Sequence, residues 1–316
     1  MNNYSPAKER TMYFIGVTTG KSSIMQVFPK WADHLKLNAR IKGFDFEPHS
    51  AAEKYREAVE FIKNDALSLG ALVTTHKLDL LKACGDLFEG RGEYATLLEE
   101  ASSISKQGKE LWAHAKDPIT SGLSLDAIAS DDYWKESGAD LHLLGAGGSS
   151  LALTLYLINK KKKGGTVPAR ILVSNRSEGR LEEMKKIHKK VGTDIHFEYY
   201  LCPTPAENDK VVAMLKPGSL IANATGLGKD RPGSPLTDDV VFPENAIVWD
   251  FNYRGDLIFL DQANAQKAEK NLRVEDGWFY FIHGWTRVIA EVFHIDIPTS
   301  GPEFKKLSEL AESTRS

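Results

Sequence analysis

Short hydrophobic runs alternate with amphipathic stretches along the first third of the chain. Strands are predicted where a run is short and apolar, at residues 12–17, 42–46 and 70–75. Helices are predicted where hydrophobic positions recur three and four apart, at residues 24–35, at 52–69 and from His76 onward. A strand followed by a helix, repeated along the chain, is the pattern of a parallel sheet.

A second series of the same kind begins near Ala139. Its apolar runs predict strands at residues 141–144, 171–173, 196–200, 219–222 and 246–249. Its amphipathic stretches predict helices at residues 149–159, 178–191 and 207–215, and the final segment is also helical, at 283–293 and 303–310. Because 316 residues exceed what one hydrophobic core usually supports, the sequence predicts two α/β domains.

A glycine-rich turn joins the strand at 141–144 to the helix that follows it. The turn reads Gly145, Ala146, Gly147, Gly148 and Ser149. Residues without a Cβ allow a tight turn and let a pyrophosphate approach the backbone N–H groups at the helix N-terminus. The strand before the turn and the helix after it favour a dinucleotide site over a turn that is merely tight. We therefore predict a Rossmann-type NAD(P)-binding domain with a parallel sheet, in which the dinucleotide site begins at Gly145.

The next strand ends in Asn175, Arg176 and Ser177, where a Rossmann unit holds the adenine ribose. An acid at this place favours NAD, whereas an arginine accommodates the 2′-phosphate of NADP. Arg176 therefore predicts NADP, with NAD as the second possibility, although a surface arginine without a cofactor contact would look the same. The loop formed by Asn223, Ala224 and Thr225 follows a further strand, and it is either a ligand loop or an ordinary Asn/Gly turn.

Composition and charge narrow the class of protein. Charged residues make up 26% of the chain and the net charge is −3, so no global basic field favours a nucleic acid. Cys84 and Cys202 have no Cys or His neighbours at metal-ligand spacing, which argues against a disulfide framework or a metal site. No run approaches about 18 apolar residues, so no membrane span is expected. These features predict a cytoplasmic protein. We also expect it to act on a small-molecule substrate, as a monomer or a homodimer.

The order of the motifs resembles the shikimate/quinate dehydrogenase family, from about Tyr13 to Glu291. The motifs that carry the resemblance are Ile15–Gly16 before a serine-containing loop, His76–Lys77 after a strand, Asp117, the turn at Gly145, Asn175–Arg176–Ser177, Asn223–Ala224–Thr225, Asp250 with Tyr253, and Asp276–Gly277. The resemblance implies an N-terminal substrate domain at residues 1–118, completed by C-terminal helices at 285–316. It also implies a cofactor domain at 119–284, to which Gly277 contributes, and an active site in the cleft.

Catalytic and substrate-binding residues are implied by the same resemblance. Lys77 matches the family's catalytic lysine and Asp117 its partner aspartate. As an ammonium, Lys77 would stabilise a developing alkoxide and pass a proton, although alone it could equally be a solvent-exposed lysine at a helix start. The further substrate contacts that we predict are Ser22, Thr75, Tyr253 and His283. The first of these could instead cap a helix, the tyrosine could be a packed surface residue, and the histidine could be structural.

Several positions depart from the pattern of the family. Ile24 stands where the family has the second serine of its substrate loop. Ser103 stands where the family has an asparagine, and Gly284 stands where it has a glutamine. Because a site built to pair substrate hydroxyls discriminates through such partners, their loss predicts a changed substrate. The resemblance thus implies an NAD(P)-dependent dehydrogenase for a shikimate-like cyclic hydroxy acid or a related polyol, such as quinate. The alternative is a cofactor-binding regulatory protein whose substrate site has degenerated.

Overall fold

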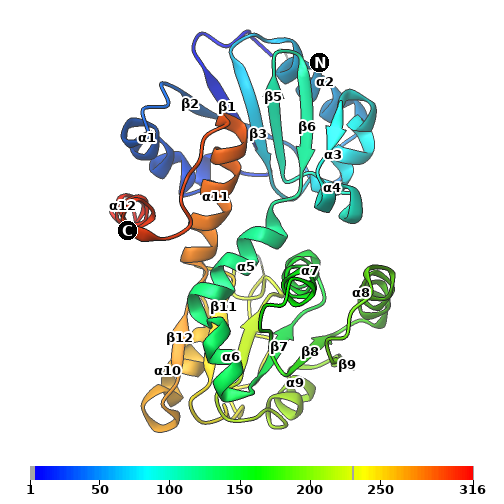
Figure 1. Cartoon of the computed structure of the whole chain (residues 1–316), viewed down its shortest axis with the longest axis vertical. Helices are drawn as coiled ribbons and strands as arrows, with labels where there is room; N and C mark the ends of the chain where they lie inside the picture. The colour runs from blue at the N-terminus through cyan, green and yellow to red at the C-terminus, as the bar shows by residue number, and fades with distance from the viewer. Residues whose placement is uncertain (1–3, 230, 316) are drawn as a thin grey trace. The chain divides into compact units, whose positions relative to one another are not determined.

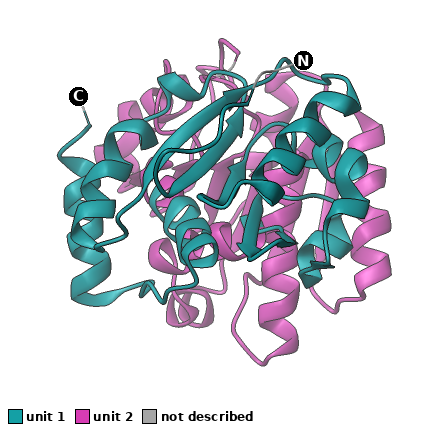
Figure 2. Ribbon diagram, turned by 90° about the horizontal axis from the view of Figure 1, so that it is seen from above, with its two compact units in different colours: residues 1–117, 282–316 teal, residues 118–281 magenta. Residues whose placement is uncertain are grey.

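The computed structural model describes residues 4–229 and 231–315, and the chain divides into two compact units. Unit 1 comprises residues 1–117 and 282–316, and unit 2 comprises residues 118–281 (Figure 2). The sequence placed these boundaries after residues 118 and 284. Each unit contains a six-stranded sheet with helices packed around it (Figure 1). The predicted α/β fold class is therefore confirmed.

The sheet of unit 1 has the strand order β2-β1-β3-β5-β6-β4. Its strands are β1 (Thr11–Gly16), β2 (Arg40–Asp45), β3 (Ser68–Val73), β4 (Gly90–Arg91), β5 (Ser103–Gln107) and β6 (Glu110–His114). Strand β1 pairs parallel with both β2 and β3, and its Ile15 lies opposite Phe44 and Val73. The carboxyl ends of β1 and β3 therefore lie at the same edge of the sheet.

The parallel pairing predicted for the N-terminal part is confirmed for β1, β2 and β3, but the sequence did not predict the antiparallel strand that follows them. Strand β5 runs antiparallel to both of its neighbours, β3 and β6. The reason is local, because β5 and β6 form a hairpin whose turn contains Gly108 with φ of +62°. Antiparallel strands can be joined by so short a turn, whereas parallel strands need a long crossover.

Five helices belong wholly to unit 1: α1 (Ile24–His34), α2 (Ala52–Asn64), α3 (Lys77–Cys84), α4 (Glu93–Leu98) and α12 (Gly301–Glu312). The helix predicted over 52–69 was wrong at its end, because α2 stops at Asn64 and β3 already begins at Ser68. The pairing of β3 with β1 and β5 overrides helix propensity there. The strand predicted over 70–75 was likewise too long, since it ends at Val73 and Thr75 has φ of +62°.

The sheet of unit 2 is parallel throughout, with the order β12-β11-β10-β7-β8-β9. Its strands are β7 (Asp140–Leu144), β8 (Arg170–Asn175), β9 (Phe197–Leu201), β10 (Leu220–Asn223), β11 (Ile247–Asp250) and β12 (Arg273–Glu275). Counted from β7, this is the 3-2-1-4-5-6 order of a dinucleotide-binding sheet. The predicted Rossmann-type parallel sheet is confirmed.

The helices of unit 2 either precede β7 or connect successive strands, and the described residues between β10 and β11 form no helix. These helices are α5 (Asp117–Ile128), α6 (Asp131–Ser137), α7 (Gly148–Lys162), α8 (Glu178–Val191), α9 (Pro205–Val212) and α10 (Ile258–Lys270). The chain then enters α11 (Trp278–Phe293), whose first residues belong to unit 2 and whose remainder belongs to unit 1. The first five residues of α11 were not predicted as helix, because the aromatic run at 278–282 has no polar face to reveal a helical period.

Each unit has a hydrophobic core of its own. In unit 1 the side chains of Tyr13, Tyr55 and Leu80 belong to one buried cluster. In unit 2 a second cluster contains Val248 and Phe259. Separate cores explain why a chain of this length forms two units.

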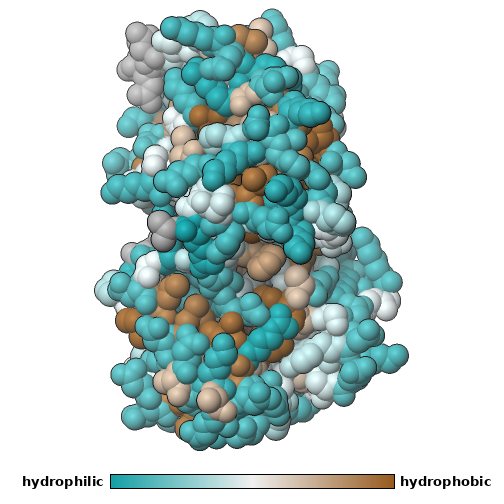
Figure 3. Space-filling model, turned by 90° about the vertical axis from the view of Figure 1, so that its left-hand side faces the viewer, coloured by the Kyte–Doolittle hydropathy of each residue, from teal (hydrophilic) through white to brown (hydrophobic). Residues whose placement is uncertain are grey.

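Polar side chains dominate the surface in view in Figure 3, and hydrophobic side chains lie in patches between them. The most exposed of the large hydrophobic residues include Leu78 and Val241, at 56% and 62%. Within residues 4–229 and 231–315, no helix has both the length and the apolar character that a membrane crossing requires.

Candidate active site and cofactor pocket

The turn after β7 in unit 2 requires glycine at its first position. Gly145 has φ of +101°, and a Cβ there would lie 3.1 Å from the Thr225 side chain and 3.2 Å from the Ala224 carbonyl oxygen. The Gly145 N–H donates to the Ser174 carbonyl at 2.8 Å, which holds the turn against β8. The Ser150 hydroxyl donates to the Gly145 carbonyl at 2.5 Å and closes the turn from the helix side. Both the positive φ and the close contacts therefore disfavour a side chain at Gly145.

Helix α7 begins directly after this turn with its N-terminus open. Among the residues that the structure describes, no side chain caps the helix, and its first turn holds no acidic residue. A Cβ added at Gly147 or Gly148 would meet no atom of the described residues within 4 Å. The backbone N–H groups of the first turn and the positive end of the helix dipole are thus accessible to a phosphate group.

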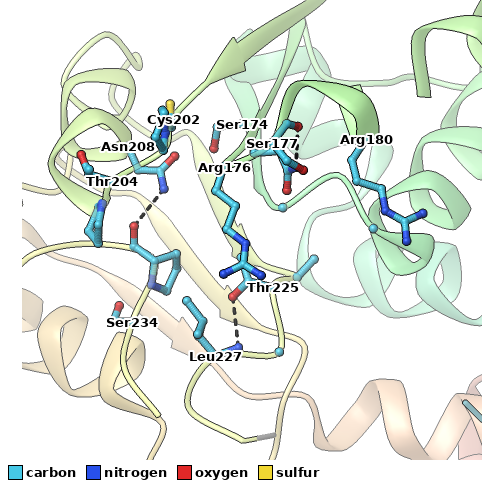
Figure 4. Close-up of a pocket in the computed structure, with 18 of the residues that line it drawn as sticks. Ser174, Arg176, Ser177, Arg180, Cys202, Thr204, Asn208, Thr225, Leu227 and Ser234 are labelled. Carbon is cyan, nitrogen blue, oxygen red and sulfur yellow. Dashed lines mark hydrogen bonds between the residues drawn. The ribbon is translucent and has the colours of Figure 1, made fainter. Parts of the chain in front are cut away.

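A pocket of about 590 Å³ lies beside this turn, within unit 2 (Figure 4). It is formed by segments that follow the carboxyl ends of β7, β8, β9 and β10, which includes the point where the strand order reverses. The predicted cofactor residues that line it are Gly145, Gly147, Asn175, Arg176, Ser177, Ala224 and Thr225. The predicted cofactor residues outside its lining are Ala146, Gly148, Ser149, Asn223 and Gly277.

Arginine side chains give this pocket its charge. Arg176 extends into the pocket toward Thr225, and Arg180 follows in the first turn of α8 (Figure 4). Arg231 also lines the pocket and comes from the loop after β10. The Asn175 amide shapes the approach, because its oxygen accepts from the Ala146 N–H at 3.2 Å and its nitrogen donates to the Ser177 carbonyl at 2.9 Å. The arrangement suits an anionic ligand whose phosphate groups accept several hydrogen bonds.

Asn223 shapes the neighbouring loop and does not line the pocket. Its side chain is fully buried, donates to Asp250 Oδ2 at 2.9 Å and accepts from the Thr225 N–H and hydroxyl at 3.1 and 2.6 Å. Burial raises the pKa of the Asp250 carboxyl to about 6, although the hydrogen bonds from Asn223 and Asn252 oppose this shift. The Asn223 amide is therefore used within the fold, and its contact with the cofactor stays a prediction.

The catalytic pair predicted in unit 1 is brought together by strand topology. Lys77 begins α3 just after β3, and Asp117 follows β6. Strands β3 and β6 are each antiparallel to the β5 between them, so their carboxyl ends lie at the same edge of the sheet. The Lys77 ammonium contacts the Asp117 carboxylate, and each side chain is 22% exposed. The pair is therefore shielded from bulk water but still accessible.

Ser22 and Thr75 lie at the same edge. Ser22 follows the 3-10 turn after β1, and its N–H donates to the Thr19 carbonyl at 3.0 Å. Thr75 is exposed and lies two residues before Lys77. Helix capping by Ser22 is not observed, because the N-cap residue of α1 is Ser23. Substrate contact by Ser22 and Thr75 stays a prediction.

The remaining predicted site residues pack within the units. Tyr253 is half-buried, and its ring lies 5.1 Å from that of Trp278 and 4.9 Å from that of Phe281. His283 is 2% exposed, stacks on Phe304 at 4.4 Å, and has its pKa lowered to about 4 by burial. A histidine held in this way has the environment of a core residue. Substrate contacts by Tyr253 and His283 stay predictions.

Gly277 is required by packing. A Cβ there would lie 2.0 Å from the Phe251 carbonyl oxygen, and its N–H donates to the Asn252 carbonyl at 2.9 Å. Glycine therefore allows the start of α11 to approach the backbone after β11. Its predicted cofactor contact remains untested.

Comparisons with known proteins found similar solved structures but no similar sequences. No protein-family model matches the sequence, and no curated relative is found. A shikimate dehydrogenase solved in complex with NADP⁺ is similar over 98% of this chain and 96% of its own, with a TM-score of 0.73 and 17% identity. Shikimate dehydrogenase from Aquifex aeolicus is similar over 99% and 100%, with a TM-score of 0.72 and 18% identity.

This chain has the shikimate dehydrogenase fold. The resemblance that the motif order predicted is thereby confirmed for the fold. The same fold is found in the 5-ketofructose reductase of Gluconobacter sp. strain CHM43, which is similar over 97% of this chain and 99% of its own, with a TM-score of 0.69 and 18% identity.

Within this shikimate dehydrogenase fold, sequence reasoning missed Glu100, Arg180 and Arg231. Glu100 precedes β5, and desolvation raises the pKa of its carboxyl to about 7. The positive charge of Lys77 lowers this pKa, and the negative charge of Asp117 raises it further. Recognising the β5–β6 hairpin would have placed Glu100 beside the Lys77–Asp117 pair. The signal for Arg180 is its spacing four residues after Arg176, whereas Arg231 reaches the pocket through a loop without a motif.

Proposed function

We propose that this protein is an NADP-dependent dehydrogenase that transfers hydride between the nicotinamide and a secondary alcohol or ketone of a polyhydroxy compound. Unit 2 would bind the cofactor and unit 1 the substrate. The single observation that carries the proposal is the contact between Lys77 and Asp117 at one edge of the unit 1 sheet, in a chain whose other unit has a dinucleotide-type sheet. An acid–base pair and a nucleotide-type turn together fit redox chemistry at an alcohol carbon.

The choice of NADP over NAD follows from the charge of the unit 2 pocket. Arg176 and Arg180 would bind the 2′-phosphate of the adenine ribose, and the open N-terminus of α7 would hold the pyrophosphate. Asn175 would keep Arg176 in place by fixing the backbone through Ser177. Solved structures of the same fold hold NADP⁺ in one case and NAD in another, so NAD remains the second cofactor to test.

Lys77 would handle the proton. When bound, the reduced nicotinamide supplies the hydride. The Lys77 ammonium would donate a hydrogen bond to the substrate carbonyl oxygen, stabilise the alkoxide that forms there, and release a proton to it. The Asp117 carboxylate would orient this ammonium, and the limited exposure of both side chains would strengthen their interaction relative to water.

The printed names of the structural neighbours frame the substrate class. They include enzymes for shikimate, a cyclic hydroxy acid, and for 5-ketofructose, an uncharged keto sugar. We propose that the substrate of this chain belongs to one of these two classes. A place in aromatic amino acid biosynthesis would follow only from the first.

The proposal is tested by following reduced-nicotinamide absorbance with NADP or NAD and a panel of shikimate, quinate, 5-ketofructose and cyclic polyols. We expect turnover of at least one compound, and Lys77→Ala should lower kcat about 10²–10⁴-fold, the usual contribution of general acid–base catalysis. Affinity for NADP should change less than about twofold, because the variant does not alter unit 2. Lys82→Ala, an exposed position on the same helix, is the matched control.

Retained turnover in Lys77→Ala would contradict the catalytic assignment. Tight NADP binding without turnover of any compound would instead favour a regulatory protein. One observation favours this regulatory alternative. Ile24 and Ser103 stand at two positions where the resemblance implies substrate ligands, and both side chains are 0% exposed.

A further inference from the structure

Glu100 occupies a central place at the catalytic edge of unit 1. Strand β5 lies between β3 and β6 and runs against them, so it begins at the edge where those two strands end. Glu100 precedes this start, while Lys77 follows β3 and Asp117 follows β6. Because β5 lies between β3 and β6 in the sheet, the segment with Glu100 lies between the segments with Lys77 and Asp117.

Backbone contacts on both sides fix the segment that carries Glu100. The Ala101 N–H donates to the Lys77 carbonyl at 3.1 Å. The Ser102 N–H donates to the His114 carbonyl at 2.9 Å, and the Ser102 hydroxyl accepts from the Lys116 N–H at 2.7 Å. Glu100 is thus tied to the start of α3 on one side and to the end of β6 on the other.

The charges around Glu100 are unbalanced toward acid. The Lys77 ammonium already contacts Asp117, and the next cation, Lys116, contacts Glu291. His114 also contacts Glu291, and burial lowers its pKa, which favours its neutral form. Glu100 is half-buried, so its carboxyl competes with Asp117 for the same ammonium in a weakly screened environment.

This charge balance bears on the substrate. A carboxylate ligand at the Lys77–Asp117 pair would face two carboxyl groups of the protein and one ammonium. The side chain of Ile24, the first residue of α1, is fully buried and carries no hydrogen-bond donor for an anion, so the hydroxyl groups predicted to contact substrate at this edge are those of Ser22 and Thr75. An uncharged polyhydroxy ligand meets no such repulsion, and its hydroxyl groups can donate to a carboxylate or accept from a carboxyl proton.

We propose that Glu100 determines substrate specificity at this site, by excluding carboxylate substrates and accepting an uncharged polyhydroxy ketone or alcohol. This inference rests on the proposed function, which it narrows to one of the two substrate classes. Glu100 would contact a hydroxyl group of the substrate beside the one that reacts, while Lys77 and Asp117 retain the proton transfer.

The test compares two ligands that differ in charge on the same ring, shikimate and its methyl ester, with fructose as an uncharged keto sugar. Affinities are measured by calorimetry on the full chain with NADP present, for the wild type, Glu100→Gln and Glu99→Gln. Gln keeps the shape of the side chain and removes its charge. Glu99 is an exposed neighbouring carboxylate and serves as the matched control.

In the wild type we expect the ester to bind at least about tenfold more tightly than shikimate at pH 8. Glu100→Gln should reduce this ratio about tenfold by tightening shikimate binding, and Glu99→Gln should leave it unchanged. Affinity for shikimate should also fall as the pH rises through about 7 in the wild type, where the Glu100 carboxyl ionises, but not in Glu100→Gln. The other charged groups nearby, Lys77, Asp117, Lys116 and Glu291, are the same in both proteins.

Shikimate binding as tight as that of its ester would overturn the inference, and so would an unchanged ratio in Glu100→Gln or binding of none of the three ligands. Binding does not require turnover, so the two proposals can fail separately. If the charge contrast holds but no compound is reduced or oxidised, the dehydrogenase proposal fails and the role of Glu100 stands. If turnover occurs but shikimate binds as tightly as its ester, the dehydrogenase proposal stands and the role of Glu100 fails.

Discussion

Gly145 and Gly147 belong to one turn but are glycine for different physical reasons. The first has a left-handed backbone and no room for a Cβ between the turn and the Thr225 loop. Gly147 has φ of −85°, which any residue can adopt, and space in front of it. Structure therefore explains the first glycine, and a ligand that approaches the backbone would explain the second.

A pair of alanine substitutions separates these two roles. Gly145→Ala should lower the free energy of unfolding by about 1–3 kcal/mol, because it adds backbone strain and a close contact. Gly147→Ala should leave stability within about 0.5 kcal/mol of the wild type but weaken NADPH binding at least about tenfold, since its Cβ would enter the pocket. Chemical denaturation and a fluorescence titration with NADPH measure the two effects. Wild-type affinity in Gly147→Ala would argue that no phosphate binds at this turn.

At the scale of elements, helix α5 packs against α7 through a glycine. A Cβ at Gly122 would lie 2.2 Å from the ring of Tyr156, whose hydroxyl contacts Asp126 on α5. The Lys160 ammonium also contacts the Asp126 carboxylate, at 2.6 Å. The close approach of the two helices thus depends on the missing side chain, and the polar contacts of Tyr156 and Lys160 hold the helices together.

Gly122→Ala tests this packing against simple helix propensity. Propensity alone predicts that alanine in a helix stabilises by about 1 kcal/mol, whereas the rigid Tyr156 ring predicts destabilisation of about 1–3 kcal/mol. We expect the second result in chemical denaturation. Gly179→Ala in α8 is the control, since its Cβ would meet no atom within 4 Å and alanine should stabilise it. Stabilisation by both substitutions would show that α5 can shift without cost.

At the scale of the whole molecule, buried ionisable groups set how stability depends on pH. Burial lowers the pKa of His142 to about 3 and that of His188 and His283 to about 4, from an ordinary value of 6.5. As the pH falls below 6.5, the unfolded chain gains protons that the folded chain does not, so stability is lost. Glu100 acts in the opposite sense, because its raised pKa means that stability is lost as the pH rises from 4.5 to about 7.

We expect the free energy of unfolding to fall on acidification from pH 6.5 toward 4, by up to about 1.4 kcal/mol per pH unit for each of the three buried histidines. Chemical denaturation over this pH range measures the slope. His283→Asn should reduce the slope by about one histidine's share, whereas His49→Asn should not, since the side chain of His49 is 89% exposed. The same slope between pH 6.5 and 5 in His283→Asn and in the wild type would contradict the assignment of His283 as neutral in the folded state.

Local sequence predicted much of unit 2. Its first four strands follow one another with a helix between each pair, and the glycine turn directly follows the first of them. The apolar pattern and turn chemistry therefore predicted five of the strands and the pocket edge at Gly145 and Arg176, whereas β12 was not predicted. The motif order also predicted Lys77 and Asp117, which the structure brings into contact.

Tertiary structure decided what depends on residues that are distant in the chain. The sequence determined which segments are strands or helices wherever the apolar period was clear, and it determined the glycine turn, because these are properties of neighbouring residues. Strand order and direction are not, since they depend on pairing between remote segments. The reversal of β5 is therefore what places Glu100 beside Lys77 and Asp117, the loop after β10 is what takes Arg231 to the pocket, and burial against Phe304 is what gives His283 the environment of a core residue.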